Sequence, residues 1–237
     1  MPSDPLQSLE TPAYSPTLAA RLVGLRPERV RRWLRGYEYD YARPTRAAQR
    51  VRRRQKPLVR SRSQGDSSFA SFLDLIDLLF VKSFVEHGIS IQKLRRALTE
   101  AEELLGDRHF ARRRFWTDGR NIYVEVRERS DALLQLLANG QWAIAPIIQE
   151  IAHSIDFQRE SGFAERWYPL GRQEPVVIDP LVAFGAPAIA GKGLETANVY
   201  DLYRAERERV DSVCSWMDLD PNEVTAAVRF EQTLQAA

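Results

Sequence analysis

The stretch SPTLAARLVGLRPERVRRWLRGY (residues 15–37) decides how the N-terminal part of the chain folds. Gly24 follows Ala20 after four residues and Val30 comes six residues later, which is the spacing of a helix-turn-helix. Two touching helices need a small residue at their contact, and a glycine tolerates the left-handed turn between them. The same spacing also occurs in helix pairs with only a structural role, so a DNA-binding function depends on further features.

Capping residues set the limits of both expected helices. Ser15 can cap a helix that begins at Pro16, because proline needs no N–H partner at that position, and Gly24 ends this helix. Pro27 opens the second helix and Gly36 stops it. The sequence therefore predicts two short helices joined by a tight turn.

The outer face of the second helix has the chemistry of a base-reading surface. Its apolar residues fall on one side, and the residues opposite them are Glu28, Arg32 and Arg35. Arginine reads guanine through a bidentate hydrogen bond, and glutamate accepts a hydrogen bond from cytosine. We therefore predict that these three side chains contact DNA bases.

A basic segment follows the helix pair directly. Residues 43–62 contain nine Lys or Arg and no acid, and we predict that part of this segment forms a short strand or wing. The segment is either a solvated loop or a phosphate-binding one, and phosphates would relieve the repulsion among its cations and make binding salt-dependent. The predicted DNA-binding residues are Arg26, Glu28, Arg29, Arg31, Arg32, Arg35, Tyr37, Arg43, Arg46, Arg50, Arg52, Arg53, Arg54, Lys56, Arg60 and Arg62.

Charge is distributed very unevenly along the 237 residues, although the net charge is only +2. Residues 1–68 hold 15 Lys or Arg against 6 Asp or Glu, a net charge of +9, and residues 69–237 hold 19 against 26, a net charge of −7. A basic head suits contact with a polyanion. The acidic remainder either meets a basic partner or only keeps the body soluble, and the sequence leaves both interpretations open.

Several functional classes are disfavoured by what the sequence lacks. It has no apolar run of about 18 residues and no secretory signal, so we expect no membrane contact and a cytoplasmic location. Cys214 is the only cysteine, which excludes an internal disulfide. His87, His109 and His153 lack metal-binding spacing, and no Walker, GxSxG or GxGxxG motif is present. We therefore expect no enzymatic activity, no metal and no cofactor.

The rest of the chain alternates helices with a few strands. Residues 69–87 predict a mostly buried helix, and a second long helix starts near Ser90. Residues 115–127 predict a β-hairpin around Asp118-Gly119, and residues 176–178 predict a short strand. Helices are expected at 196–205, at 210–217 and after the capping residue Asp220. Their expected core is Leu202, Val213, Trp216, Val224, Val228 and Phe230.

Two parts of the chain resemble known families. Residues 14–105 resemble a MerR-type DNA-binding domain, because the helix-turn-helix and basic wing precede the helix pair FLDLIDLLFVKSFVEHGISIQKLRRAL. Residues 176–234 resemble the domain of unknown function 433, where the chain departs from the usual Gly-Thr-Arg-Ile-Pro by reading GKGLE at 191–195. The residues that match this second family are Asp179-Pro180, Gly185, Pro187, Gly191, the helix from Thr196, Leu219-Asp220, Val224, Ala226-Ala227 and Phe230.

Proteins that join these two parts resemble the larger VapB-type antitoxins of type II toxin–antitoxin systems. This resemblance implies a PIN-domain ribonuclease of the VapC type as partner, operator DNA as a second partner, autorepression, and a homodimer or larger assembly. The toxin contact would lie on the outer face of the C-terminal helices or on the proline-rich arm before them. The residues that the resemblance marks for toxin binding are Asp179, Pro180, Gly185, Pro187, Gly191 and Lys192.

The predicted fold is mainly α with a small β component. It comprises a flexible lead-in (1–13), a MerR-like winged helix-turn-helix (14–107), a middle segment with a β-hairpin (108–164) and a C-terminal three-helix domain (165–237). The alternative to an antitoxin is a stand-alone MerR-type regulator that senses a small molecule. Its pocket would be lined by aromatic residues that otherwise belong to the core, namely Trp116, Tyr123, Trp142 and Trp167.

Overall fold

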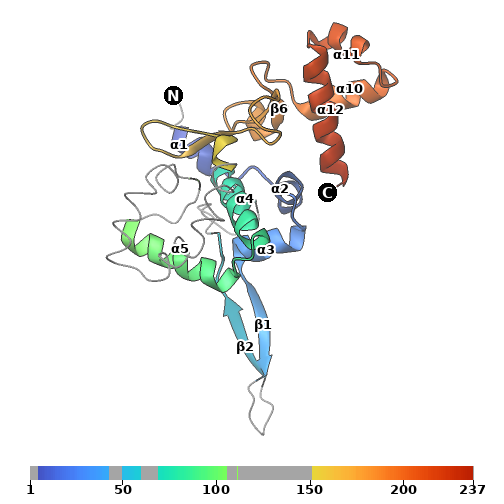
Figure 1. The fold of residues 1–237 in the computed structure, drawn as a ribbon. Helices are drawn as coiled ribbons and strands as arrows, with labels where there is room; N and C mark the ends of the chain where they lie inside the picture. Colours follow the sequence, from blue (N-terminus) through green and yellow to red (C-terminus); the bar gives the residue numbers. More distant parts are fainter. Residues whose placement is uncertain (1–4, 43–49, 60–68, 106–110, 112–150, 237) are drawn as a thin grey trace.

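The computed structural model describes residues 5–42, 50–59, 69–105, 111 and 151–236 (Figure 1). Over these residues the fold is mixed, with helices and two small antiparallel sheets. The elements are α1 (Pro5–Glu10), α2 (Pro16–Val23), α3 (Pro27–Arg35), β1 (Tyr37–Ala42), β2 (Arg50–Gln55), α4 (Phe72–Glu86), α5 (Ile91–Leu105), β3 (Ile155–Phe157), β4 (Ala164–Trp167), β5 (Val176–Ile178), the 3₁₀ turn η1 (Ala183–Gly185), β6 (Pro187–Ile189), α10 (Thr196–Ala205), α11 (Val210–Met217) and α12 (Pro221–Ala236).

Helix α4 is the centre of the molecule, as its sequence predicts. It is apolar on nearly every side, so it is most stable where other elements cover it all round. Its start is fixed by a capping box in which Ser71 and Asp74 exchange side-chain and backbone hydrogen bonds of 2.8 and 3.1 Å. The buried apolar residues of α4 are Phe72, Leu73, Leu75, Ile76, Leu78, Phe80, Val81 and Phe84.

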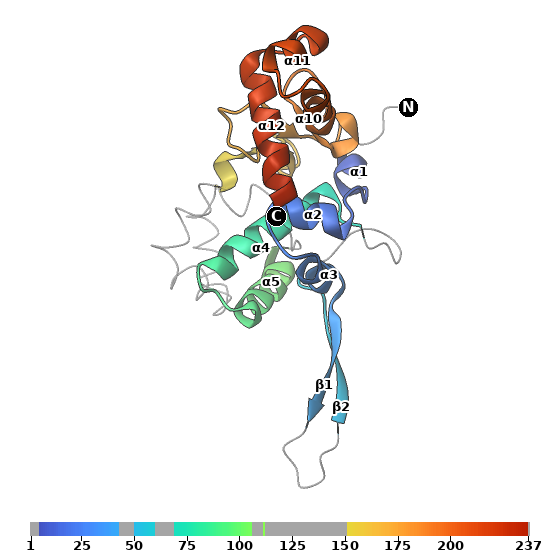
Figure 2. The ribbon, with the colours of Figure 1, turned by 90° about the vertical axis from the view of Figure 1, so that its right-hand side faces the viewer.

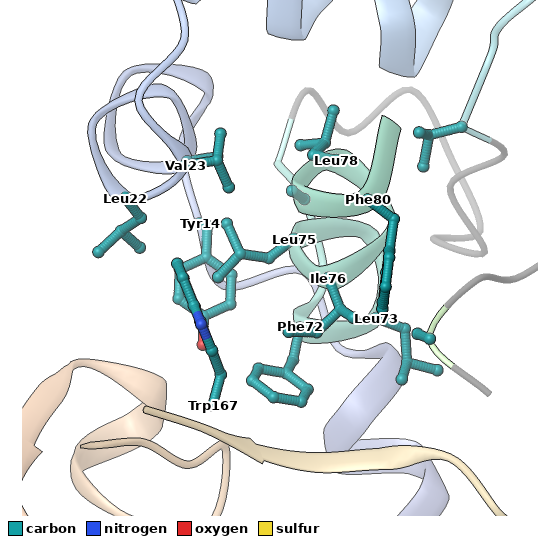
Figure 3. Packing of buried hydrophobic residues seen from close by; sticks show 14 of the residues in the cluster. Tyr14, Leu22, Val23, Phe72, Leu73, Leu75, Ile76, Leu78, Phe80 and Trp167 are labelled. Atoms are coloured by element: carbon teal, nitrogen blue, oxygen red, sulfur yellow. The ribbon is translucent and has the colours of Figure 1, made fainter. Parts of the chain in front are cut away.

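One continuous core surrounds α4 and joins the two ends of the chain. Figure 3 shows Tyr14 from the N-terminal segment and Trp167 from β4 lying beside Phe72 and Leu75. Helices α1, α2 and α3 pack directly against α4, and the residues Ala226, Phe230 and Leu234 of α12 belong to the same core. The N-terminal and C-terminal parts are therefore packed together rather than merely linked.

The larger sheet is an antiparallel meander in the order β3-β4-β5-β6. The predicted strand at 176–178 is confirmed as β5, whose three residues are all buried. The expected boundary between residues 164 and 165 falls inside β4, which pairs with both β3 and β5. The hairpin predicted at 115–127 lies outside the described residues.

The C-terminal helices have the predicted limits but only part of the predicted core. Val213, Val224 and Val228 are buried together in a second apolar cluster, and Leu202 packs at its edge. Trp216 was wrongly placed in this core, because 73% of its surface is exposed on α11. Phe230 is buried, but it packs in the main core because α12 contacts α2 and β5 as well as α10. A single helix therefore serves two cores.

The N-terminal lead-in is more ordered than expected. Residues 1–13 were predicted to be flexible, yet Pro5–Glu10 form α1. The reason is the burial of Leu9, which is 2% exposed and packs in the main core. Burial of this apolar side chain thus stabilises a segment whose prolines suggested a loose chain.

Tyr14 ties three distant parts of the chain together. Its backbone N–H donates to the carbonyl of Ala70 at 3.0 Å and its carbonyl accepts from the Ala70 N–H at 2.8 Å. Its ring is buried in the core, and its hydroxyl donates to the carbonyl of Gly185, 171 positions away, at 2.9 Å. Burial, and secondarily the charge of Asp179, raises the pKa of the Tyr14 hydroxyl well above its ordinary 10.0.

We predict that Tyr14→Phe lowers the free energy of unfolding by about 1–2 kcal/mol at neutral pH, because it leaves the buried Gly185 carbonyl without its donor. The raised pKa means that the unfolded chain ionises Tyr14 above pH 10 while the folded chain keeps it neutral, so wild-type stability falls as pH rises past 10.0. Urea unfolding across this pH range should show a shallower fall for Tyr14→Phe. Tyr39→Phe, at an exposed tyrosine, is the control, and an equal pH response in both variants would contradict this role.

Candidate DNA-binding surface

Helices α2 and α3 meet at the residues that their spacing predicted. Ser15 caps α2 by accepting from the Leu18 N–H at 3.1 Å, and Gly24 ends α2 in the left-handed conformation (φ 66°, ψ 50°). Ala20 and Val30 are both fully buried, so the small residue and the β-branched residue lie where the two helices pack. The turn between them holds α3 at a fixed angle on the body.

The outer face of α3 is a row of exposed charged side chains. Its other face buries Val30, Trp33 and Leu34 against the core. Without DNA, these charged groups contact their neighbours: the Arg29 guanidinium lies 5.9 Å from the Trp33 ring centre, the Arg32 guanidinium lies 5.4 Å from that of Tyr37, and Glu28 pairs with Arg31 at 3.6 Å. The predicted residues Arg26, Glu28, Arg29, Arg31, Arg32 and Arg35 are all exposed.

A two-stranded hairpin projects from the end of α3, away from the body (Figures 1 and 2). Strand β2 lies within the predicted basic segment, but its partner β1 was not predicted. The missed signal is the alternation of YEYDY at 37–41, which is typical of a strand with two different faces. Of the predicted basic residues, Arg52, Arg53, Arg54 and Lys56 are exposed, Arg50 lies in β2, and Arg43, Arg46, Arg60 and Arg62 lie outside the described residues.

The base of the hairpin is fixed to the end of α3. The N–H groups of Leu58 and Val59 both donate to the carbonyl of Trp33, at 2.8 and 3.0 Å, and both side chains are buried. Gly36 makes the sharp turn from helix to strand at φ 76° and ψ −172°. A Cβ at Gly36 would lie 2.1 Å from the carbonyl oxygen of Gln55. Only glycine lets β1 leave the helix this close to β2.

A second feature, at the other end of the body, involves the residues marked for toxin binding. The Asp179 carboxylate is 5% exposed; it accepts from the Arg166 guanidinium at 2.7 Å and from the Leu181 N–H at 2.9 Å. Gly185 and Pro187 are also buried. Only Gly191 and Lys192 are exposed, and Pro180 is half-buried. Most of this set therefore shapes the loop rather than forming its surface.

The loop that these buried residues shape presents apolar side chains to solvent. Ala183, Phe184 and Gly185 all have positive φ, of 48°, 54° and 81°. Phe184 is 96% exposed and Leu181 is 66% exposed, which is unusual for large apolar side chains. A groove of about 420 Å³ lies beside Phe184, lined by residues from Ser8 to Tyr14 and by Phe72, Pro180 and Gly185. Left-handed backbone at two non-glycine residues costs free energy, and such strain often marks a functional loop.

The structure also shows where some of the other residues considered in the sequence analysis lie. Trp167 is buried in the core, while Trp116, Tyr123 and Trp142 lie outside the described residues. Cys214 packs at the edge of the second apolar cluster. Within the described part of the chain, no group of His, Cys, Asp or Glu is arranged to hold a metal ion. Over the same residues, every helix is too short or too polar to cross a membrane.

The chain has distant relatives among known proteins, although no protein-family model matches it. A protein of Mycobacterium tuberculosis (strain ATCC 25618 / H37Rv) named "Putative antitoxin VapB45" is 23% identical over 207 residues, which cover 83% of this chain and 84% of that protein. The X-ray crystal structure of Rv2018 from Mycobacterium tuberculosis has a TM-score of 0.66 at 20% identity, covering 93% of this chain and 99% of that one. The fold is thus seen in a crystal structure, and the sequence is distantly similar to that of a protein carrying the name of a putative VapB antitoxin.

We predict that Gly36→Ala loosens the hairpin base, since both its backbone conformation and the Gln55 carbonyl exclude a side chain. Hydrogen exchange of the Leu58 and Val59 amides should accelerate by a factor that corresponds to at least about 2–3 kcal/mol. Gly24→Ala is the control, because its nearest neighbour is the flexible end of Lys82 and its cost should be about 1 kcal/mol. Equal protection of these amides in both variants would show that Gly36 is not essential.

Proposed function

We propose that the protein is the antitoxin of a type II toxin–antitoxin pair, which neutralises a ribonuclease and represses its own operon by binding DNA. The observation that carries this proposal is the row of exposed arginines on α3, together with the exposed basic residues of the hairpin that projects from its end. The similarity to a protein named as a VapB antitoxin supports the choice of an antitoxin over other DNA-binding proteins. Both activities belong in the cytoplasm, and neither makes the chain itself an enzyme.

In this proposal α3 enters the major groove and the hairpin follows the adjacent phosphate backbone, as in a MerR-like winged helix-turn-helix. Glu28, Arg32 and Arg35 read base edges. A homodimer would present two copies of α3 to a palindromic operator. Among the remaining predicted residues, the candidates for phosphate contact are Arg26, Arg29, Arg31, Tyr37, Arg43, Arg46, Arg53, Lys56, Arg60 and Arg62.

The proposed toxin contact is the strained loop at residues 179–187. Buried Asp179, Gly185 and Pro187 hold this loop in shape, and Leu181 and Phe184 are the side chains that it exposes. We therefore place the contact on Leu181 and Phe184, with half-buried Pro180 and exposed Gly191 and Lys192 nearby. A PIN-domain ribonuclease would cover the Phe184 ring and fill the neighbouring groove, which removes apolar surface from water.

We predict that Arg35→Ala weakens binding to the promoter of the protein's own operon by about 1–3 kcal/mol and relaxes base preference. The measurement is fluorescence anisotropy with promoter DNA and with a scrambled duplex of equal length. Arg159→Ala removes an equally exposed arginine from the body and should leave binding unchanged. An equal loss on both duplexes would assign Arg35 to phosphates rather than bases.

We predict that Phe184→Ser abolishes neutralisation of a PIN-domain ribonuclease encoded beside the gene, because it removes the most exposed aromatic ring of the loop. Co-expression should restore toxicity, and the two proteins should no longer co-purify. Binding to promoter DNA should persist, since α3 lies at the other end of the body. Trp216→Ser is the matched control, and loss of neutralisation in that variant alone would move the contact to α11.

A further inference from the structure

We propose that the hairpin binds nucleic acid through one face only, the face that carries Tyr37, Tyr39 and Arg53. The proposal rests on the DNA-binding function proposed above and deepens it. The basic residues of the hairpin are then not equivalent, although sequence reasoning treated them as one phosphate-binding set. Arg52 and Arg53 are neighbours in β2, but only Arg53 lies on the face that we assign to nucleic-acid binding.

The strand register divides the hairpin into two chemically different faces. Residues paired across an antiparallel hairpin share a face, and successive residues alternate between faces. Tyr37 pairs with Gln55 and Tyr39 with Arg53, which places these residues on one face. The pairs on the opposite face are Glu38 with Arg54 and Asp40 with Arg52. We call the first the tyrosine face and the second the acid face.

The acid face offsets part of its own positive charge. It carries the carboxylates of Glu38 and Asp40, and Arg52 contacts Glu38 at 2.7 Å. Arg54 lies on the same face, and the register places Arg50 there as well. The side chains of the Arg52–Glu38 pair are 76% and 49% exposed, so the pair contributes little to stability. Its larger effect is to offset part of the charge that would attract a phosphate. A polyanion approaching this face meets Glu38 and Asp40 as well as the arginines.

The tyrosine face is continuous with the outer surface of α3. Arg32 of α3 lies over the Tyr37 ring at 5.4 Å, and the rings of Tyr37 and Tyr39 lie 5.8 Å apart at 45°. Both rings are more than a third exposed, at 41% and 38%. The surface thus runs from the proposed base-reading helix onto two aromatic rings and Arg53 without an acid between them.

The chemistry of the tyrosine face fits a nucleic-acid backbone. Arginine and tyrosine hydroxyls donate to phosphate oxygens, and an aromatic ring packs on sugars and bases. Two exposed tyrosine rings beside two guanidinium groups provide both kinds of contact. Since α3 occupies a groove in the proposed complex, the backbone next to that groove is the group that this face meets. The acid face then points away from the duplex.

The test compares two neighbouring arginines on opposite faces. The full chain is titrated onto a fluorescein-labelled mixed-sequence duplex of about 30 base pairs, between about 50 and 200 mM NaCl. We expect Arg53→Ala to raise Kd about fivefold to tenfold at 0.1 M salt and to reduce the log–log salt slope by about 0.9, the effect of one lost phosphate contact. Arg52→Ala, at the adjacent and also exposed position, should leave Kd within about twofold of the wild type and the salt slope unchanged.

The tyrosine contribution is tested separately from the charge. Tyr39→Ala should raise Kd about fivefold with an unchanged salt slope, because a neutral side chain releases no counterion. Tyr39→Phe keeps the ring and should lose less affinity. Asp40→Ala on the acid face is the matched control and should not weaken binding.

The outcomes separate this proposal from the function on which it rests. Equal effects of Arg52→Ala and Arg53→Ala would overturn the assignment of one face while leaving DNA binding intact. A loss of self-association in Tyr39→Ala and Arg53→Ala, with unchanged DNA binding, would make this face an interface between copies and would also overturn it. A wild-type chain that binds no duplex, including its own promoter, would overturn the proposed DNA-binding function together with the inference.

Discussion

Burial of Tyr14 against α4 is the constraint on which the arrangement of the described chain depends. Its backbone pairs with Ala70 at the entrance to α4, its ring fills the core, and its hydroxyl reaches the Gly185 carbonyl. Satisfying a buried hydroxyl and a buried carbonyl at once requires the N-terminal segment and the C-terminal loop to meet at one place. The segment that leads into α2 and the strained loop therefore meet at the same packed centre.

Local sequence signals predicted the helices well, because capping is decided by a few neighbouring residues. Ser15, Gly24 and Gly36 mark the helix limits that the structure shows, and Pro221 marks the start of α12. Pairing between distant strands left no such signal, so the meander of β3 to β6 was not predicted beyond one strand. Phe230 was misassigned because a helical pattern shows which residues share a face, but not which of two cores covers it. Trp216 was misassigned because the same pattern does not show whether any core covers that face.

The same difference between local signals and long-range pairing applies to the site residues. The exposed arginines of α3 could be assigned from helical periodicity, whereas the contribution of β1 depended on a register that only the fold reveals. In the C-terminal part, the residues that mark the family resemblance are largely those that hold a loop in an unusual conformation. Asp179 and Gly185 are buried for that reason, and the side chain presented to a partner is the intervening Phe184.

The two hydrogen bonds to the Trp33 carbonyl also fix the position of the hairpin relative to α3. Because the N–H groups of Leu58 and Val59, which follow β2, both bind the last turn of α3, the base of the hairpin cannot move away from the helix without breaking both bonds. Six-residue strands reach about 20 Å at the usual rise of about 3.3 Å per residue. The helix and the hairpin thus keep a fixed spacing, and the strands of the hairpin are about as long as six base-pair steps of a duplex. The distance between the contact in the groove and the contact on the phosphate backbone is therefore set within one chain and does not depend on a partner.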